Sequence, residues 1–157
     1  MAAIKRDKRD ILFSFLVRGR TEWACERCGK RYNQDSARGL ECAHIFSRRY
    51  RGTRWFPQNA LSLCVSCHFF FTGNPIEFTE WVERKLGPSV CARLRVLRNE
   101  ICKLSKSDLA EIETNLADSL ARMKAARDSG IVGRIEFASP YPRDRLERAA
   151  ELARKVA

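Results

Sequence analysis

The sequence predicts an α+β protein, with a small irregular core of short strands and loops followed by a mostly helical tail. Residues 21–64 contain three glycines and a proline around two short apolar stretches, 40–45 and 60–63, which we expect to be strands. Beyond residue 75, apolar side chains recur at helical spacing between Gly and Pro boundaries. The 157 residues are enough for one domain with an appendage.

The expected helices follow from apolar periodicity and from residues that begin or end helices. Apolar positions from 4 to 16 predict a basic amphipathic helix over 4–17. We expect a short helix after Cys64 and, starting from Pro75, another that runs to residue 86. The remaining expectations are a helix over 88–104, one capped by Ser107 or Asp108 that runs to 128, and a last one over 143–156. The resulting division is a basic N-terminal helix (1–20), a core (21–75) and a helical C-terminal extension (76–157).

The charge balance favours a polyanionic partner. The chain has 30 Lys and Arg against 19 Asp and Glu, a net charge of +11, and residues 1–57 carry +8 of it. The alternative is a basic protein that is merely soluble. Because no apolar run approaches the ~18 residues of a membrane helix and the N-terminus has no signal-peptide pattern, we expect a cytoplasmic protein without a membrane partner.

The cysteines predict a metal site. Four of the seven form two C-x-x-C pairs, and an odd total without a secretion signal argues against disulfides. Each pair places two thiolates on one tight turn, which is one edge of a tetrahedral zinc site, and two pairs complete the site. We therefore expect a structural Zn²⁺ bound by Cys25, Cys28, Cys64 and Cys67. A redox role for the pairs is a weaker alternative.

The only two histidines, His44 and His68, lie in the same region. Four thiolates fill a structural zinc site, so both imidazoles remain available for a second, catalytic metal ion or for general-base chemistry.

These segments resemble a known nuclease motif. Glu-Cys-Ala-His-Ile (residues 41–45) and Asn-Ala-Leu-Ser-Leu-Cys-Val-Ser-Cys-His (residues 59–68) resemble the His–Asn–His (HNH) endonucleases, the zinc-braced ββα-metal class, over residues 21–75. The following residues 68–82 are similar to phage-encoded members, the Rap/NinG recombination nucleases of lambda-like phages. The resemblance implies a ββα-metal (His-Me finger) core and a metal-dependent DNA endonuclease in phage DNA recombination or processing, located in the bacterial host cytoplasm.

The resemblance also implies roles for individual residues. His44 would be the general base, and His68 would bind one divalent ion, Mg²⁺, Mn²⁺ or another. Asn59 would hold the loop or act as a weak metal ligand. Many family members carry a second metal ligand where this chain has Ala43, which leaves three readings: a metal held by His68 and Asn59, an added ligand from Glu41, or weakened activity. In the last reading the chain is a non-catalytic zinc-ribbon DNA-binding module.

Arginines and one tryptophan between the two motif halves are expected to contact DNA, because Arg forks match phosphate oxygens and aromatic rings can stack on bases. This set is Arg48, Arg49, Arg51, Arg54 and Trp55. The alternative is a solvated loop in which Trp55 caps the core. The N-terminal basic residues 5, 6, 8 and 9 would add phosphate contacts or form a solvated helix face. The apolar face of residues 109–123 would dock on the core or mediate a homodimer.

Overall fold

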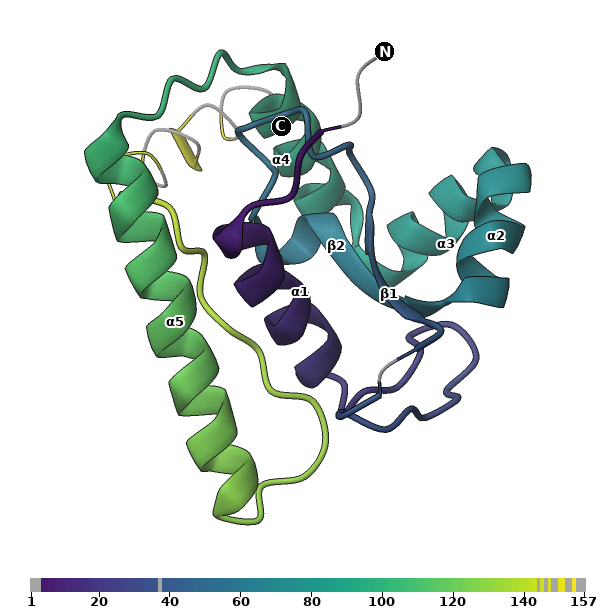
Figure 1. The fold of residues 1–157 in the computed structure, drawn as a ribbon. Coiled ribbons are helices and arrows are strands. Elements are labelled where there is room, and N and C mark those ends of the chain that lie inside the picture. Colours follow the sequence, from purple (N-terminus) through teal and green to yellow (C-terminus); the bar gives the residue numbers. More distant parts are fainter. Residues whose placement is uncertain are drawn as a thin grey trace.

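The computed structural model describes residues 4–36, 38–143, 145, 147, 150, 151 and 154 and confirms the α+β class (Figure 1). The long α5 lies beside α1 on one side, the sheet lies in the middle, and α2 and α3 lie on the other side. In chain order the elements are α1 (Lys8–Gly19), β1 (Leu40–His44), η1 (Pro57–Asn59), β2 (Ala60–Cys64), α2 (Val65–Gly73), α3 (Pro75–Leu86), α4 (Pro88–Asn99) and α5 (Lys106–Asp128). None of the helices in the described part of the chain combines the length and apolarity needed to cross a bilayer.

The two strands form an antiparallel pair that leads directly into α2. His44 pairs with Ala60 at one end and Leu40 with Cys64 at the other. Cys64 then serves as the N-cap of α2, where its Sγ accepts a hydrogen bond from the backbone N–H of Cys67. The strand expectations are met to within one residue at their C-terminal ends.

Helix ends differ from the expectation where a nearby capping residue competes better. The first helix begins at Lys8 rather than residue 4, because Asp7 and Asp10 form a capping box there. Ser105, rather than Ser107 or Asp108, caps α5, and Asp108 is its capping-box partner. The fourth helix ends at Asn99, where the chain becomes extended, and not at residue 104. The last expected helix, 143–156, falls partly outside the described residues, and those described between 143 and 154 are helical.

One hydrophobic cluster joins all three expected segments. It includes Leu16 from α1, Phe56 from the loop before β2, Leu94 from α4, and Ile112 and Leu116 from α5. The apolar face of α5 therefore docks on the rest of the chain. A homodimer through the extension stays a prediction. A second cluster surrounds the sheet and the first turns of α2.

A buried ion pair connects α1 with the second cluster. The Glu26 carboxylate accepts from the Arg20 guanidinium at 2.8 Å, and both side chains are 2% exposed. Glu26 also accepts from the backbone N–H of Ser62 at 3.0 Å and pairs with Lys85 and Arg134. Burial alone would raise the pKa of Glu26, but Arg20 and the other partners lower this pKa to about 2. Glu26 is therefore ionised at neutral pH.

We expect Glu26→Gln to lower the free energy of unfolding by about 3 kcal/mol, because Arg20 would keep a buried charge without its partner. Urea denaturation in zinc-containing buffer measures this change. Glu80→Gln is the matched control: Glu80 is largely exposed and pairs with Arg84 one helical turn away, so its replacement should cost at most about 0.5 kcal/mol. Equal effects of the two substitutions would contradict the role of the buried pair.

Candidate active site

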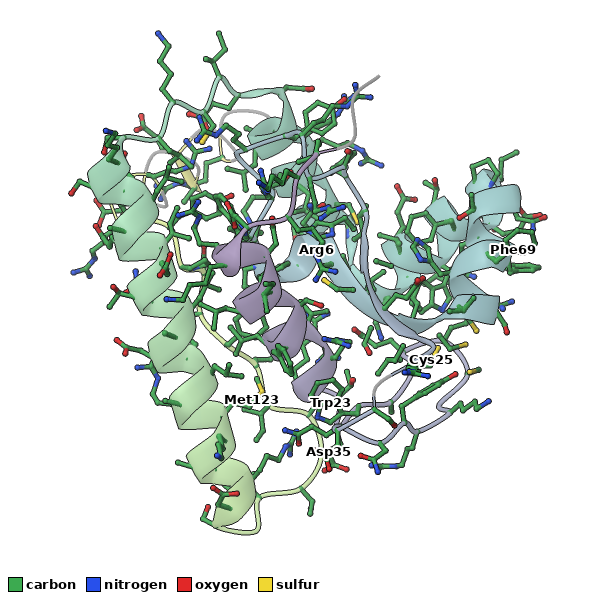
Figure 2. The ribbon with its side chains drawn as sticks, in the orientation of Figure 1. Arg6, Trp23, Cys25, Asp35, Phe69 and Met123 are labelled. Atoms are coloured by element: carbon green, nitrogen blue, oxygen red, sulfur yellow. The ribbon has the colours of Figure 1, made fainter. Side chains whose placement is uncertain are left out.

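Four sulfur atoms from two distant segments lie together. The Sγ atoms of Cys25, Cys28, Cys64 and Cys67 are all within 4.8 Å of one another. The first two come from the loop that follows α1, where Figure 2 labels Cys25, and the other two from the junction of β2 and α2. The Cys28–Cys64 sulfur distance is 3.8 Å. A tetrahedron with Zn–S bonds of about 2.3 Å has edges of about 3.8 Å, so the cluster fits zinc.

The surroundings of Cys67 oppose its ionisation in the absence of a cation, although Arg27 lies beside its sulfur. The Arg27 guanidinium lies 3.6 Å from the Cys67 sulfur and 4.0 Å from the centre of the Phe70 ring. Burial raises the pKa of the Cys67 thiol to about 12 in the absence of a metal ion. Four adjacent thiols can all ionise only when a cation offsets their charge, which is what a bound Zn²⁺ provides.

A separate cleft of about 410 Å³ lies between α1 and the sheet. His44 and Glu41 from β1 and His68 from α2 line it. Three arginines, Arg6, Arg18 and Arg48, also line it, and Figure 2 shows Arg6 beside the N-terminal end of α1. The two histidines predicted from the sequence as site residues therefore line one cleft that also contains three arginines.

The His44 ring is held by a backbone carbonyl. Its Nε2 lies 2.9 Å from the Arg54 carbonyl oxygen, so Nε2 must carry the proton and donate it. Burial lowers the pKa of His44 below its ordinary value, and the positive charge of Arg48 lowers it further, against the opposing effects of the Arg54 carbonyl, Asp10 and the Cys42 backbone. The imidazole is therefore neutral at pH 7, with an unprotonated Nδ1.

Asn59 holds the loop between the strands. Its Nδ2 donates to the carbonyl oxygens of Phe46 and Thr53, and its Oδ1 accepts from the Phe46 N–H, each at 2.9 Å. The side chain is fully buried. This arrangement corrects the reading of Asn59 as a metal ligand, because its polar atoms are already used inside the protein.

Glu41 and His68 lie against each other at the cleft. Glu41 Oε2 is 2.7 Å from His68 Nδ1, and the two side chains are 49% and 40% exposed. This separation is that of a direct hydrogen bond between the imidazole and the carboxylate. Ala43 is buried in the hydrophobic cluster around the sheet and cannot contribute. Among the described residues the four cysteines form the one group of three or more potential metal ligands.

The residues of the basic loop differ in their surroundings. Arg48 lines the cleft, whereas the exposed Arg49 and Arg51 lie outside its lining in the described structure. The expected DNA contact is wrong for Trp55, whose ring is 1% exposed and therefore cannot stack on a base. The Arg54 guanidinium pairs with Asp10 at 2.6 Å and its side chain is 13% exposed, so its DNA contact stays a prediction.

Two charged residues of the cleft, Asp10 and Arg18, were not predicted from the sequence. Arg18 is stacked between the Phe15 and Trp23 rings, at 5.2 and 4.9 Å from their centres, and lines the cleft. Asp10 lines it as well. The helical spacing of Asp10, Ser14 and Arg18 on the helix was a signal that could have placed them on one face. Of the other N-terminal cations, Lys8 and Arg9 pair instead with Glu113 of α5.

No family model, curated protein or solved structure matches this chain. The geometry and chemistry of the cleft therefore carry the functional interpretation.

We expect Cys67→Ser to release most of the bound zinc and to abolish or strongly lower the thermal unfolding transition, because the binding energy of a structural zinc site is folding energy, on the order of 10 kcal/mol. Elemental analysis and a thermal melt measure both effects. Cys102→Ser is the matched control, since Cys102 lies outside the sulfur cluster. A Cys67→Ser protein with unchanged zinc content and melting temperature would contradict the zinc site.

Proposed function

We propose that the chain is a metal-dependent DNA endonuclease of the HNH type, acting in phage DNA recombination or processing. The carrying observation is that His44, His68 and Glu41 line a single cleft together with three arginines. The order of two antiparallel strands followed directly by α2 supports the ββα-metal resemblance. The net charge of +11 supports a nucleic-acid substrate.

In this proposal His44 activates the attacking water. Its Nε2–H is engaged by the Arg54 carbonyl, so the lone pair of Nδ1 accepts the proton as water attacks the phosphorus. The buried position keeps the imidazole neutral and ready to accept a proton at pH 7.

The remaining cleft residues bind the phosphodiester. His68 and Glu41 would hold a divalent ion, which supplies Lewis-acid stabilisation of the scissile phosphate and of the leaving 3′ oxygen. Arg48 and Arg18 donate to phosphate oxygens, and Arg6 extends this contact along the strand. Hydrolysis in this arrangement leaves 5′-phosphate and 3′-hydroxyl ends.

A second candidate is a non-catalytic zinc-ribbon DNA-binding module. The burial of Ala43 favours it, because the position before the general base offers no metal ligand. The two candidates differ in a plasmid-nicking assay with Mg²⁺, Mn²⁺ or other divalent ions. DNA binding without nicking under any of them would favour the module.

We expect His44→Ala to reduce plasmid cleavage at least about 10²-fold while DNA affinity and zinc content stay unchanged, because only the proton acceptor is removed. Cleavage rates, gel-shift titrations and elemental analysis measure the three quantities. Arg84→Ala, an exposed cation on α3 outside the cleft, serves as the control and should cleave like the wild type. Full activity of the His44→Ala protein would sink the assignment of the base.

The pH dependence of cleavage should report the burial of His44. Protonation inactivates the base, and burial followed by the charge of Arg48 disfavours protonation, so the acid limb of kcat/KM, which reports the protein without DNA, should have its midpoint below 6.5. Arg48→Gln removes one positive charge beside the ring and should move this midpoint upward, toward 6.5. A midpoint that lies above 6.5 in the wild type would be inconsistent with this environment.

A further inference from the structure

We propose that Asp10, which lies outside the HNH resemblance, is a positioning residue that fixes the orientation and tautomer of His44 through the backbone of Arg54. Its importance for catalysis rests on the proposed function, whereas its effect on the imidazole is a property of the folded chain.

All hydrogen-bonding capacity of the Asp10 carboxylate is directed at the loop and at the start of α1. Oδ1 accepts from Arg54 Nε and from Trp55 Nε1, each at 3.0 Å. Oδ2 accepts from Arg54 Nη2 at 2.6 Å and from the backbone N–H of Asp7 at 2.9 Å. Asp10 is only 4% exposed. The fork of Arg54 therefore meets both carboxylate oxygens, which is the geometry that best fixes a guanidinium.

The residue held in this way is the one whose carbonyl holds His44. Arg54 is engaged through its side chain by Asp10 and through its carbonyl oxygen by His44 Nε2 at 2.9 Å. Trp55, the next residue, is bound to the same carboxylate through its indole. The N–H of the 54–55 peptide also donates to the Tyr141 hydroxyl at 3.2 Å, so the contacts of Asp10 and this bond together set the direction of the peptide. A rotation of that peptide would remove the acceptor for Nε2–H and let the proton move to Nδ1.

The negative charge of Asp10 also affects His44. Asp10 is the acidic neighbour that stabilises the imidazolium of His44, whereas Arg48 from the loop opposes it. The other charged or titratable groups around the cleft are Arg6 before α1, Arg18 on α1, Glu41 and Cys42 on β1, and His68 on α2. Burial opposes ionisation of Asp10, but its bonds from Arg54 and Asp7 hold its pKa below the ordinary value, so the carboxylate is charged at neutral pH.

A purely structural role for Asp10 makes a different prediction from a positioning role. If Asp10 only stabilised the fold, a folded Asp10→Asn protein would keep the imidazole of His44 unchanged. An asparagine amide presents N–H groups where Oδ2 or Oδ1 now accepts, so at least one donor among Arg54, Trp55 and Asp7 would face another donor. We expect the 54–55 peptide to lose its fixed direction as a result.

The tautomer can be measured directly by ¹⁵N NMR of the imidazoles in the zinc-loaded full chain. Two histidines make assignment simple, with His44→Ala and His68→Ala spectra as references. The wild type should show His44 as a single Nε2–H tautomer, and Asp10→Asn should shift its two ring nitrogens toward the values of a tautomer mixture. Asp7→Asn is the matched control at the same helix end, because asparagine is an equally good N-cap. A single unchanged tautomer in folded Asp10→Asn would overturn the inference.

Cleavage kinetics provide the second readout. Asp10→Asn should lower kcat by about 10- to 100-fold with little change in KM for DNA, since misdirection of the base affects the chemical step. Arg54→Lys breaks the same fork and should give a similar loss, and the double variant should be no slower than either single one. Additive losses would overturn the relay through Arg54. If the wild type cleaves no DNA but Asp10→Asn still changes the tautomer of His44, the proposed function is refuted and the positioning of His44 by Asp10 stands.

If Asp10→Asn does not fold, the Arg54→Lys protein carries the NMR test alone. Lysine keeps the positive charge opposite Asp10 but cannot meet both oxygens. A folded Arg54→Lys protein with one fixed Nε2–H tautomer would then contradict the relay.

Discussion

The arrangement of the cleft depends on the four-sulfur cluster. It joins the loop after α1 to the point where β2 becomes α2, two segments separated by the whole of β1 and the basic loop. His68 immediately follows one of these cysteines, in the first turns of α2, and its partner Glu41 lies on the paired strand β1. A metal ion bound by the sulfurs would therefore set where His68 stands relative to β1, without itself lying in the cleft.

Helix α1 completes the cleft from the side opposite the sheet. Asp10, Ser14 and Arg18 of α1 line it, and α1 in turn packs on α5. The shared hydrophobic cluster ties this wall to α4 and to the loop before β2. Buried Arg20 extends the connection, because it binds the carbonyls of Pro57 and Ala60 as well as Glu26. The C-terminal extension thus packs against α1 and stabilises this wall of the cleft.

The sequence was informative where chemistry is encoded locally and silent where it depends on distant partners. The strands and the sulfur cluster follow from alternation and C-x-x-C spacing, which involve neighbours along the chain. Helix starts were less certain, because several residues near position 105 can act as caps. The arginines of the loop look alike in sequence, but a carboxylate 44 residues away binds the guanidinium of Arg54, whereas Arg48 lines the cleft. Arg18 was missed because its place depends on stacking against Phe15 and Trp23.

The loop between His44 and Asn59 is fastened from several sides. Gly52 lies so close to the Leu97 carbonyl that no larger residue fits, and the Tyr141 hydroxyl donates to the Arg51 carbonyl and accepts from the Trp55 N–H. These contacts limit how far the loop can change conformation when a ligand binds. In the proposed nuclease the duplex would have to bend or unstack to reach the base, so preference among target sequences would reflect how easily each one deforms.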